Sequence, residues 1–277
     1  MFYNAKNGSV PIAGTEMDYV CFGRGAEALV ILPGLSDGLR TVGGTSVSKA
    51  LSHRAYARKY RVYMLSRRNI LPEGFTTRDM AADVAYALHH LGIDHANVLG
   101  ISQGGMIAQF LAIDHPELVK KLVLAVSLCR PNDTVCTTIP RRIAWAKAGD
   151  YRSIVLDTIE TSSSPSRLRF YRLAYPVLGR TGKPKSFDRF LIHAKACITH
   201  DASAELARIA CPTLVIGGDS DRNVGFDTSE ELAEHIPGSL LHIYPGLGHA
   251  AFLEARDFRD RVLEFLSASC LQTFTCS

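Results

Sequence analysis

The sequence has no long hydrophobic run, no closely spaced cysteine pair and little net charge. No apolar stretch approaches the roughly 18 residues that a membrane-spanning helix needs, so we expect no membrane partner. The seven cysteines are scattered, and the opening MFYNAKNGSVPIAG lacks the basic and apolar segments of a signal peptide. A formal net charge of +4 is too small to indicate a nucleic-acid partner. We therefore expect a soluble cytoplasmic protein with reduced thiols.

The motifs of common cofactor and metal sites are also missing. The chain has no glycine-rich dinucleotide fingerprint and no phosphate-binding loop. The stretch HHLGIDH lacks the spacing that zinc ligands on a helix require. We expect neither a cofactor nor a metal, and nothing in the sequence indicates an oligomeric state.

Short apolar segments alternate with longer amphipathic segments along much of the chain. The expected strands are residues 17–22, 28–33, 60–65, 96–101, 120–126, 212–217 and 239–244. The expected helices are residues 46–58, 77–92, 104–119, 228–236 and 257–269. The central strand candidates are apolar without alternation, which is typical of strands covered on both faces. This pattern predicts an α/β fold with a mostly parallel central β-sheet flanked by helices.

The alternation stops between residues 131 and 208. The stretch RPNDTVCTTIP, residues 130–140, is expected to be a loop, and amphipathic helical segments follow it with no strand between them. We interpret residues 131–208 as a helical cap inserted into a core formed by residues 1–130 and 209–277. Residues 131–200 carry twelve Lys and Arg against five Asp and Glu. This excess could attract an anionic substrate, or it could be a solvated helix face.

Residues 100–104, Gly-Ile-Ser-Gln-Gly, match the pattern G-x-S-x-G between an expected strand and an expected helix. A nucleophilic serine there sits on a sharp turn that exposes its hydroxyl, and flanking glycines let the strand and helix pack closely. The following helix directs its free N–H groups at the same place. The motif therefore indicates Ser102 as a nucleophile, although a close-packed turn without chemistry would look the same.

A serine hydroxyl needs a base to remove its proton. Of the ten histidines, His249 lies in a glycine-rich loop after the last expected strand, where its ring can reach the carboxyl edge of the sheet. Asp219 and Asp221 follow the strand at 212–217 and are the two candidates for the carboxylate that orients the histidine. Alternatively, one of these two aspartates caps the next helix or closes the turn.

These features resemble the α/β-hydrolase superfamily, most closely its serine-dependent capped members, which include small esterases, carbon–carbon bond hydrolases and haloperoxidase-like enzymes. The resemblance covers nearly the whole chain and rests on residues 100–104, the stretch CPTLVIGGDSDRNV and the late Gly-His pair. It implies a catalytic triad in the order Ser102, Asp221, His249, with Asp219 as a structural carboxylate.

A tetrahedral intermediate also needs backbone donors for its oxyanion. One expected donor is the N–H of Gln103, directly after the nucleophile. The family usually carries His-Gly in the loop after the first core strand, where this chain has Pro33-Gly34. The N–H of Leu35 is the expected second donor, and Ser36 is the alternative and a candidate substrate contact.

The cap of such relatives covers the site, so its aromatic residues are candidate pocket residues. We expect Trp145, Tyr171 and Tyr175 to contact the substrate, and the further candidates for an apolar wall are Tyr151, Phe170 and Phe190. Any one of them could instead pack the cap against the core.

The expected function is hydrolysis of a small-molecule ester or thioester through an acyl-enzyme, without a cofactor. The same triad could instead hydrolyse a carbon–carbon bond or carry out perhydrolysis. A slow-turnover small-molecule receptor on the same fold also stays open. Dehalogenases and epoxide hydrolases of this superfamily are disfavoured, because they carry an aspartate where this chain has Ser102.

Overall fold

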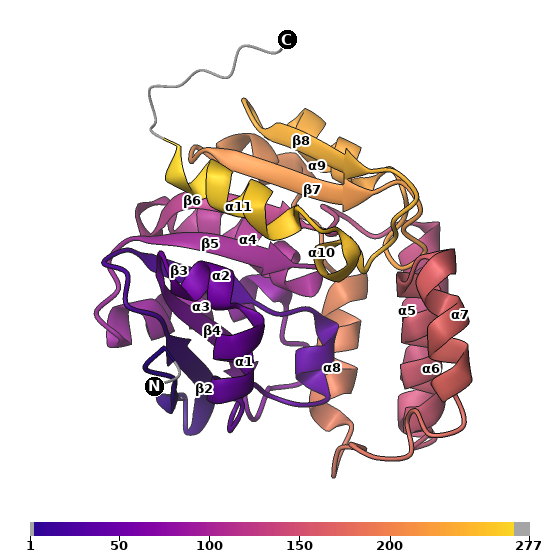
Figure 1. The fold of residues 1–277 in the computed structure, drawn as a ribbon. Helices are drawn as coiled ribbons and strands as arrows, with labels where there is room; N and C mark the ends of the chain where they lie inside the picture. Colours follow the sequence, from indigo (N-terminus) through magenta and orange to yellow (C-terminus); the bar gives the residue numbers. More distant parts are fainter. Residues whose placement is uncertain (1–2, 269–277) are drawn as a thin grey trace.

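The computed structural model describes residues 3–268, and an eight-stranded β-sheet forms its centre (Figure 1). The order across the sheet is β1-β2-β4-β3-β5-β6-β7-β8. All neighbours from β4 to β8 pair in parallel, and the pairs β1–β2 and β2–β4 are antiparallel. The strands are β1 (Lys6–Ile12), β2 (Thr15–Phe22), β3 (Ala28–Leu32), β4 (Arg61–Arg68), β5 (Ala96–Ile101), β6 (Val119–Ala125), β7 (Thr213–Gly218) and β8 (Leu240–Tyr244). The predicted α/β fold with a mostly parallel sheet is confirmed.

Strand β1 is the one strand that the sequence analysis missed. It lies at the sheet edge, where it pairs only with β2 and buries only Val10 and Ile12. Pro11 is tolerated there because an edge strand need not donate every N–H to a neighbour. With so few buried positions, the segment shows no apolar run that would mark it as a strand.

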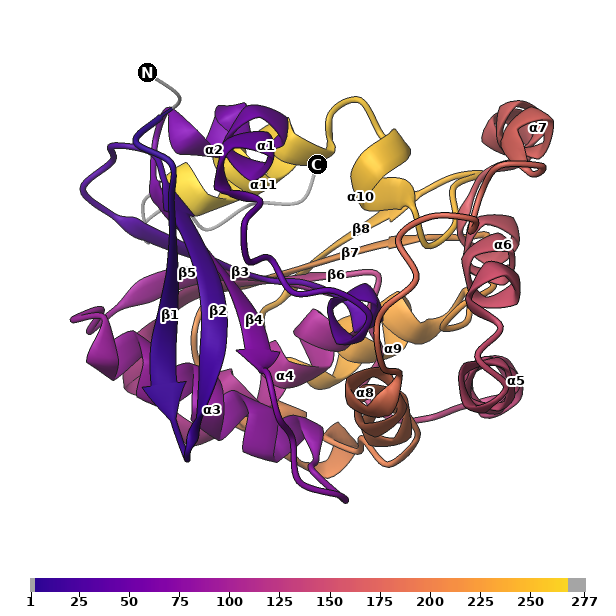
Figure 2. The ribbon, with the colours of Figure 1, turned by 90° about the horizontal axis from the view of Figure 1, so that it is seen from below.

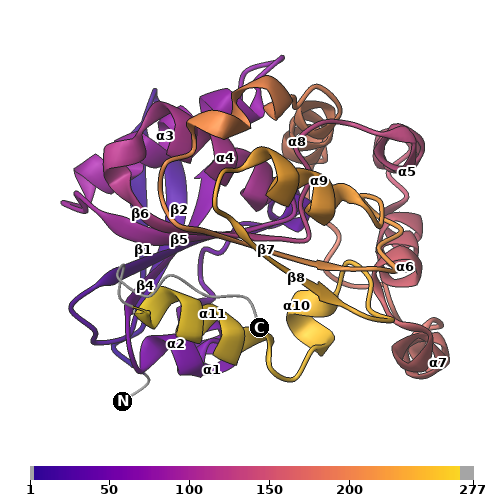
Figure 3. The same ribbon diagram turned by 90° about the horizontal axis from the view of Figure 1, so that it is seen from above.

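Helices cover both faces of the sheet. Figures 2 and 3 show α1, α2 and α11 on one face, and α3, α4 and α9 on the other. The helices of these layers are α1 (Ser46–Ser52), α2 (Arg54–Ala57), α3 (Thr77–His90), α4 (Gln103–Asp114), α9 (Thr228–His235), α10 (Ala251–Glu254) and α11 (Phe258–Ser267), with the 3₁₀ turns η1 (Leu35–Gly38), η2 (Pro116–Leu118) and η3 (Ser203–Arg208). Residue 269, the end of the last expected helix, lies outside the described residues.

Helix α3 illustrates how the sequence specifies these layers. Thr76 and Asp79 form a reciprocal capping box, in which each side chain accepts a hydrogen bond from the other residue's backbone N–H. Met80, Val84 and Leu88 recur every four residues and are all buried. The helix therefore begins at a defined residue and presents one apolar stripe to the sheet.

Four helices lie between β6 and β7, at one end of the sheet (Figure 1): α5 (Asp133–Lys147), α6 (Tyr151–Ser162), α7 (Pro165–Ala174) and α8 (Asp188–Ile198). Helix α8 lies nearer the sheet than α5, α6 and α7, as Figure 2 also shows. The expected loop at 130–140 is corrected, because α5 already begins at Asp133. Asn132 caps this helix by accepting the N–H of Val135 at 3.0 Å, and Pro140 lies inside it. Asn, Asp and Thr in this stretch are typical of a loop, but here they form a capped helix start.

Every helix within residues 3–268 is too short or too polar to cross a membrane. The cysteines in the same range are free thiols, namely Cys21, Cys129, Cys136, Cys197 and Cys211. Cys270 and Cys276 lie outside the described residues.

Candidate active site

Ser102 occupies the sharp turn between β5 and α4. Its backbone angles, φ 54° and ψ −120°, are rarely adopted by a residue with a side chain. A Cβ on Gly104 would lie 1.9 Å from the carbonyl oxygen of Leu32, and a Cβ on Gly100 would lie 2.5 Å from the carbonyl oxygen of Gly104. Both glycines are therefore required by close backbone approach, which explains the G-x-S-x-G spacing.

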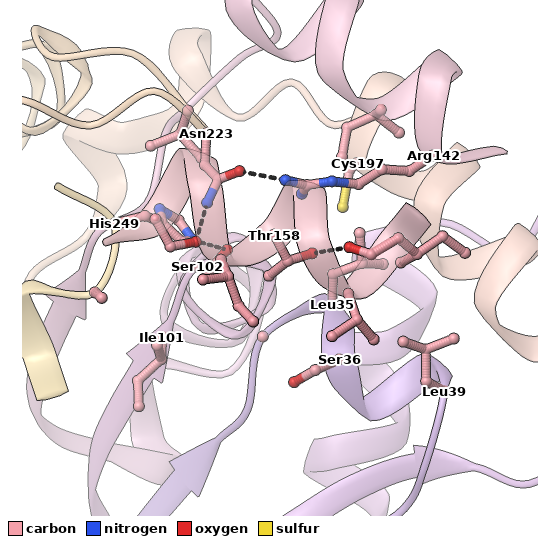
Figure 4. A pocket seen from close by; sticks show the side chains of 18 of the residues that line it. Leu35, Ser36, Leu39, Ile101, Ser102, Arg142, Thr158, Cys197, Asn223 and His249 are labelled. Atoms are coloured by element: carbon pink, nitrogen blue, oxygen red, sulfur yellow. Dashed lines mark hydrogen bonds between the residues drawn. The ribbon is translucent and has the colours of Figure 1, made fainter. Parts of the chain in front are cut away.

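The structure brings the three expected side chains together at the carboxyl end of the parallel strands. Nε2 of His249 lies 2.9 Å from Oγ of Ser102, and Nδ1 of His249 lies 2.7 Å from Oδ2 of Asp221. Ser102 immediately precedes α4, Asp221 lies in the loop after β7, and His249 lies in the loop after β8. Figure 4 shows Ser102 and His249 side by side at the cavity. The geometry allows the imidazole to take the serine proton while the carboxylate holds its other nitrogen.

The two aspartates after β7 have different surroundings. Asp221 is 4% exposed, and its Oδ1 accepts the N–H groups of Asn223 at 2.8 Å and Val224 at 3.1 Å. Its Oδ2 is thereby directed at His249. Asp219 is exposed, and its Oδ1 accepts the N–H of Gly246 at 2.7 Å, which fastens the loop after β7 to the loop after β8.

Two backbone N–H groups meet next to Ser102. Leu35 is the first residue of η1 and Gln103 is the first residue of α4, and neither helix has a side-chain cap. The first N–H groups of a helix have no acceptor inside it, so both are available to a ligand. A Cβ on Gly34 would lie 3.2 Å from Cβ of Ser102, which shows how closely the loop after β3 approaches the serine.

The side chain of Gln103 has a second role that the sequence reasoning missed. Its Nε2 donates to the backbone oxygen of His193 at 2.7 Å, and its Oε1 lies 3.0 Å from Nδ1 of His193. His193 belongs to α8, and burial together with the nearby Arg67 holds its pKa well below the ordinary value. The neutral imidazole thus links α8 to Gln103, the residue that follows Ser102. Ninety residues separate the two partners, and no local motif signals such a contact.

A cavity of about 460 Å³ opens above Ser102 and His249, both of which form part of its wall (Figure 4). This volume is typical of a small-molecule site. Most of the wall is apolar, and its members include Leu35, Leu39, Met106, Ile139, Ile154 and Phe190. The helices between β6 and β7 supply much of it. The arrangement can therefore hold an apolar part of a small molecule against the serine.

The expected substrate contacts are only partly brought to this cavity. Ser36 and Tyr171 line it, as do Tyr151 and Phe190. Trp145 does not: its ring faces the guanidinium of Arg141 at 5.5 Å and packs among cap residues. Tyr175 does not either, because its hydroxyl donates to Glu160 at 2.5 Å. The expectation for Trp145 and Tyr175 is corrected, since each aromatic ring is used in packing or pairing within the cap helices.

Several polar wall residues were missed by the sequence reasoning. Arg142, Thr158, Ser162 and Asn223 line the cavity with the apolar residues (Figure 4). Phe170, a further aromatic candidate, is 66% exposed. Among residues 3–268, no group of three or more His, Cys, Asp or Glu side chains is arranged to hold a metal ion.

Comparison with known proteins identifies the family. A family model described as the alpha/beta hydrolase fold matches residues 27–191. The chain is 31% identical to the 2-hydroxy-6-oxononadienedioate/2-hydroxy-6-oxononatrienedioate hydrolase of Burkholderia vietnamiensis, over 91% of this chain and 92% of that protein. It is 28% identical to the "Putative carbamate hydrolase RutD" of Caulobacter sp. (strain K31), over 84% of this chain and 89% of that protein.

Solved structures show the same fold. MGS-M2, an alpha/beta hydrolase enzyme from a Medee basin deep-sea metagenome library, superposes with a TM-score of 0.83 at 22% identity, covering 97% of this chain and 100% of that chain. The enol-lactonase of Burkholderia xenovorans LB400 superposes with a TM-score of 0.79 at 19% identity, covering 94% and 100%. On the family model, the relatives and this architecture together, the chain belongs to the α/β-hydrolase family of enzymes.

Proposed function

We propose that the protein is a serine hydrolase that cleaves a carboxylic ester or thioester of a small molecule through an acyl-enzyme. The observation that carries the proposal is the 2.9 Å contact between Oγ of Ser102 and Nε2 of His249 in the wall of a mostly apolar cavity. The 2.7 Å contact of His249 with buried Asp221 supports it, because an oriented imidazole is the base that a serine nucleophile needs.

In the first step, Nε2 of His249 accepts the hydroxyl proton of Ser102 while Oγ attacks the carbonyl carbon. The oxyanion that forms accepts hydrogen bonds from the N–H groups of Leu35 and Gln103. Asp221 stabilises the imidazolium, which then gives its proton to the departing alcohol or thiol. The acyl group stays bound to Ser102.

In the second step, water replaces the leaving group. His249 accepts a proton from this water as its oxygen attacks the acyl carbonyl, and the same two N–H groups bind the new oxyanion. Collapse of the intermediate releases the acid and returns the proton to Ser102.

A second candidate is hydrolysis of a carbon–carbon bond next to a ketone. The relative from Burkholderia vietnamiensis, at 31% identity over 91% of this chain, is named as a hydrolase of 2-hydroxy-6-oxononadienedioate and 2-hydroxy-6-oxononatrienedioate. The same serine, histidine and N–H groups can act on a ketone carbonyl. The two candidates therefore differ in substrate and share one site.

The test is the initial hydrolysis rate of p-nitrophenyl acyl esters from short to long chains, measured beside a 2-hydroxy-6-oxo-dienoate. We expect the wild type to prefer one acyl length, and Ser102→Ala to lower the rate by at least about 10⁴-fold, because the nucleophile is removed. Turnover of the dienoate alone, dependent on Ser102, would select the second candidate. Equal rates for the wild type and Ser102→Ala would overturn both.

A further inference from the structure

A buried guanidinium lies in the mostly apolar wall of the cavity. Arg142, on α5, is 6% exposed and lines the cavity. Of the twelve basic side chains in residues 131–200, it alone is buried. The basic excess of this segment is therefore mostly a solvated surface. A buried charge is costly unless it is paired and hydrogen-bonded, so the partners of Arg142 show what it is placed to do.

The protein uses only part of the hydrogen-bonding capacity of Arg142. Its Nε donates to Oδ2 of Asp157 at 2.8 Å, and its Nη2 donates to Thr161 at 2.9 Å and to Oδ1 of Asn223 at 2.6 Å. Its Nη1 has no acceptor within residues 3–268, and it is not sealed from the cavity. Two N–H bonds of a rigid, always charged group thus remain for a ligand.

The charge of Arg142 is also only partly compensated. Asp157 accepts hydrogen bonds from both Arg142 and Arg141, so one carboxylate faces two guanidinium groups. Arg141 is largely in solvent, with 41% of its side chain exposed, whereas the side chain of Arg142 is 7% exposed. The Oδ2 of Asp221 is directed at His249. Arg142 therefore shares the carboxylate of Asp157 with Arg141, in a wall where screening by water is weak.

Hydrogen bonds fix this charge relative to the catalytic residues. Asn223 accepts from Arg142 through its side chain, and its backbone N–H donates to Asp221. Nδ2 of Asn223 donates to Oγ of Ser162, whose hydroxyl proton is left for a ligand. Figure 4 shows the guanidinium of Arg142 reaching toward Asn223, on the side of the cavity that carries His249.

We propose that Arg142 binds a carboxylate of the substrate, so that the natural ester carries a second, free carboxyl group. A carboxylate oxygen can accept a charge-assisted hydrogen bond from the free Nη1 of Arg142, with the hydroxyl of Ser162 as a further donor. The inference rests on the proposed function, and it names the substrate class of that site.

The test compares two p-nitrophenyl esters of equal length, the monoester of adipic acid with its free carboxylate and the hexanoate with a methyl group in that place. We expect the wild type to prefer the adipate, and Arg142→Met to lower the adipate-to-hexanoate ratio of kcat/KM by about 10- to 100-fold. Arg142→Lys should restore part of this preference. The ratio cancels any general effect of the substitution on folding or on Ser102.

Arg141→Met is the matched control, because it removes the other guanidinium that shares Asp157 and does not line the cavity. It should leave the ratio as in the wild type. An unchanged ratio in Arg142→Met, or a wild type without preference for the adipate, would overturn the carboxylate site while the serine chemistry stands. Loss of Ser102 dependence would instead remove the proposed function.

Binding without turnover separates these cases further. In the Ser102→Ala variant, calorimetry should detect free adipate, and adding Arg142→Met should weaken that binding at least about 10-fold. Equal affinity in both variants contradicts the proposal, whatever reaction the serine performs.

Discussion

Ser102 has a backbone conformation that few residues with side chains adopt, and the two glycines beside it make that conformation possible. These steric requirements act over a few residues and fix the spacing of the glycines around Ser102. The nucleophile candidate could therefore be predicted from the sequence. The partners of Gln103 could not, because the amide contacts His193 on a helix ninety residues away. Arg142 was equally invisible, since an arginine in an amphipathic helix usually faces solvent.

Asp221→Asn and Asp219→Asn form a matched pair of substitutions that compares the roles of the two carboxylates. In Asp221→Asn, the amide oxygen can keep the N–H groups of Asn223 and Val224, which turns the NH₂ group toward His249. Nδ1 must then accept, so Nε2 carries the proton and cannot act as the base. We expect kcat to fall by about 10³- to 10⁴-fold.

Asp219→Asn should change kcat less than about threefold, because an amide oxygen still accepts the N–H of Gly246. Steady-state kinetics on the preferred p-nitrophenyl ester measure both variants. A severe effect in Asp219→Asn with a mild one in Asp221→Asn would exchange the roles of the two carboxylates.

Helix α8 joins the helical segment between β6 and β7 to the site. Its Arg189 donates to Oδ2 of Asp37 at 2.6 Å and to the backbone oxygen of Arg67 at 2.9 Å. Burial alone would raise the pKa of Asp37, but the guanidinium groups of Arg189 and Arg67 hold it below the ordinary value. Asp37 lies in η1, beside the expected oxyanion donor Leu35. The ion pair therefore anchors α8 and η1 to each other.

Arg189→Met should lower the free energy of unfolding by about 3 kcal/mol, because it leaves the buried carboxylate of Asp37 without its shorter ion pair. Arg172→Met is the control: the arginine side chain of its pair with Glu160 is 59% exposed, so solvent screening should make the loss of this pair much smaller than the loss at Arg189. Urea unfolding followed by circular dichroism measures both. Equal losses in the two variants would show that α8 is not held by this pair.

At the scale of the whole molecule, the buried His200 makes the free energy of unfolding depend on pH. His200 is 1% exposed, where its Nδ1 lies 2.8 Å from the hydroxyl of Thr77 on α3 and its Nε2 lies 3.4 Å from Oε1 of Gln109 on α4. Burial lowers its pKa from 6.5 to about 4. Between these values the unfolded chain binds a proton that the folded chain excludes. The stability that the folded protein gains from keeping His200 neutral is therefore complete above pH 6.5 and is lost as the pH falls toward 4.

We expect this one histidine to remove about 2 kcal/mol of stability between pH 7 and pH 5. His200→Gln should unfold with a correspondingly flatter pH dependence, while the exposed His89→Gln should follow the wild type. Urea titrations at pH 5, 6 and 7 measure the slopes. An unaltered slope in His200→Gln would show that His200 is protonated in the folded state.

Local patterns in the sequence were sufficient for much of the architecture. Buried strands show continuous apolar runs, α3 shows a capping box and an apolar stripe, and the turn at Ser102 shows its two glycines. Each of these patterns can be recognised because it depends on residues that are close together in the sequence. Edge strand β1 and the start of α5 were misread, since their composition is that of a loop and their structure depends on pairing or capping.

The α/β class and the candidates Ser102 and His249 could therefore be stated from local patterns in the sequence, whereas the choice of Asp221 over Asp219 rested on the resemblance to the α/β-hydrolase superfamily. Only the tertiary structure decided that Trp145 and Tyr175 lie outside the cavity wall and that Arg142 lies in it. The same holds for the hydrogen bonds that join α8 to η1 and α4. The physical reason is that the orientation of a docked helix results from many weak contacts between distant residues. No short stretch of the chain carries that information.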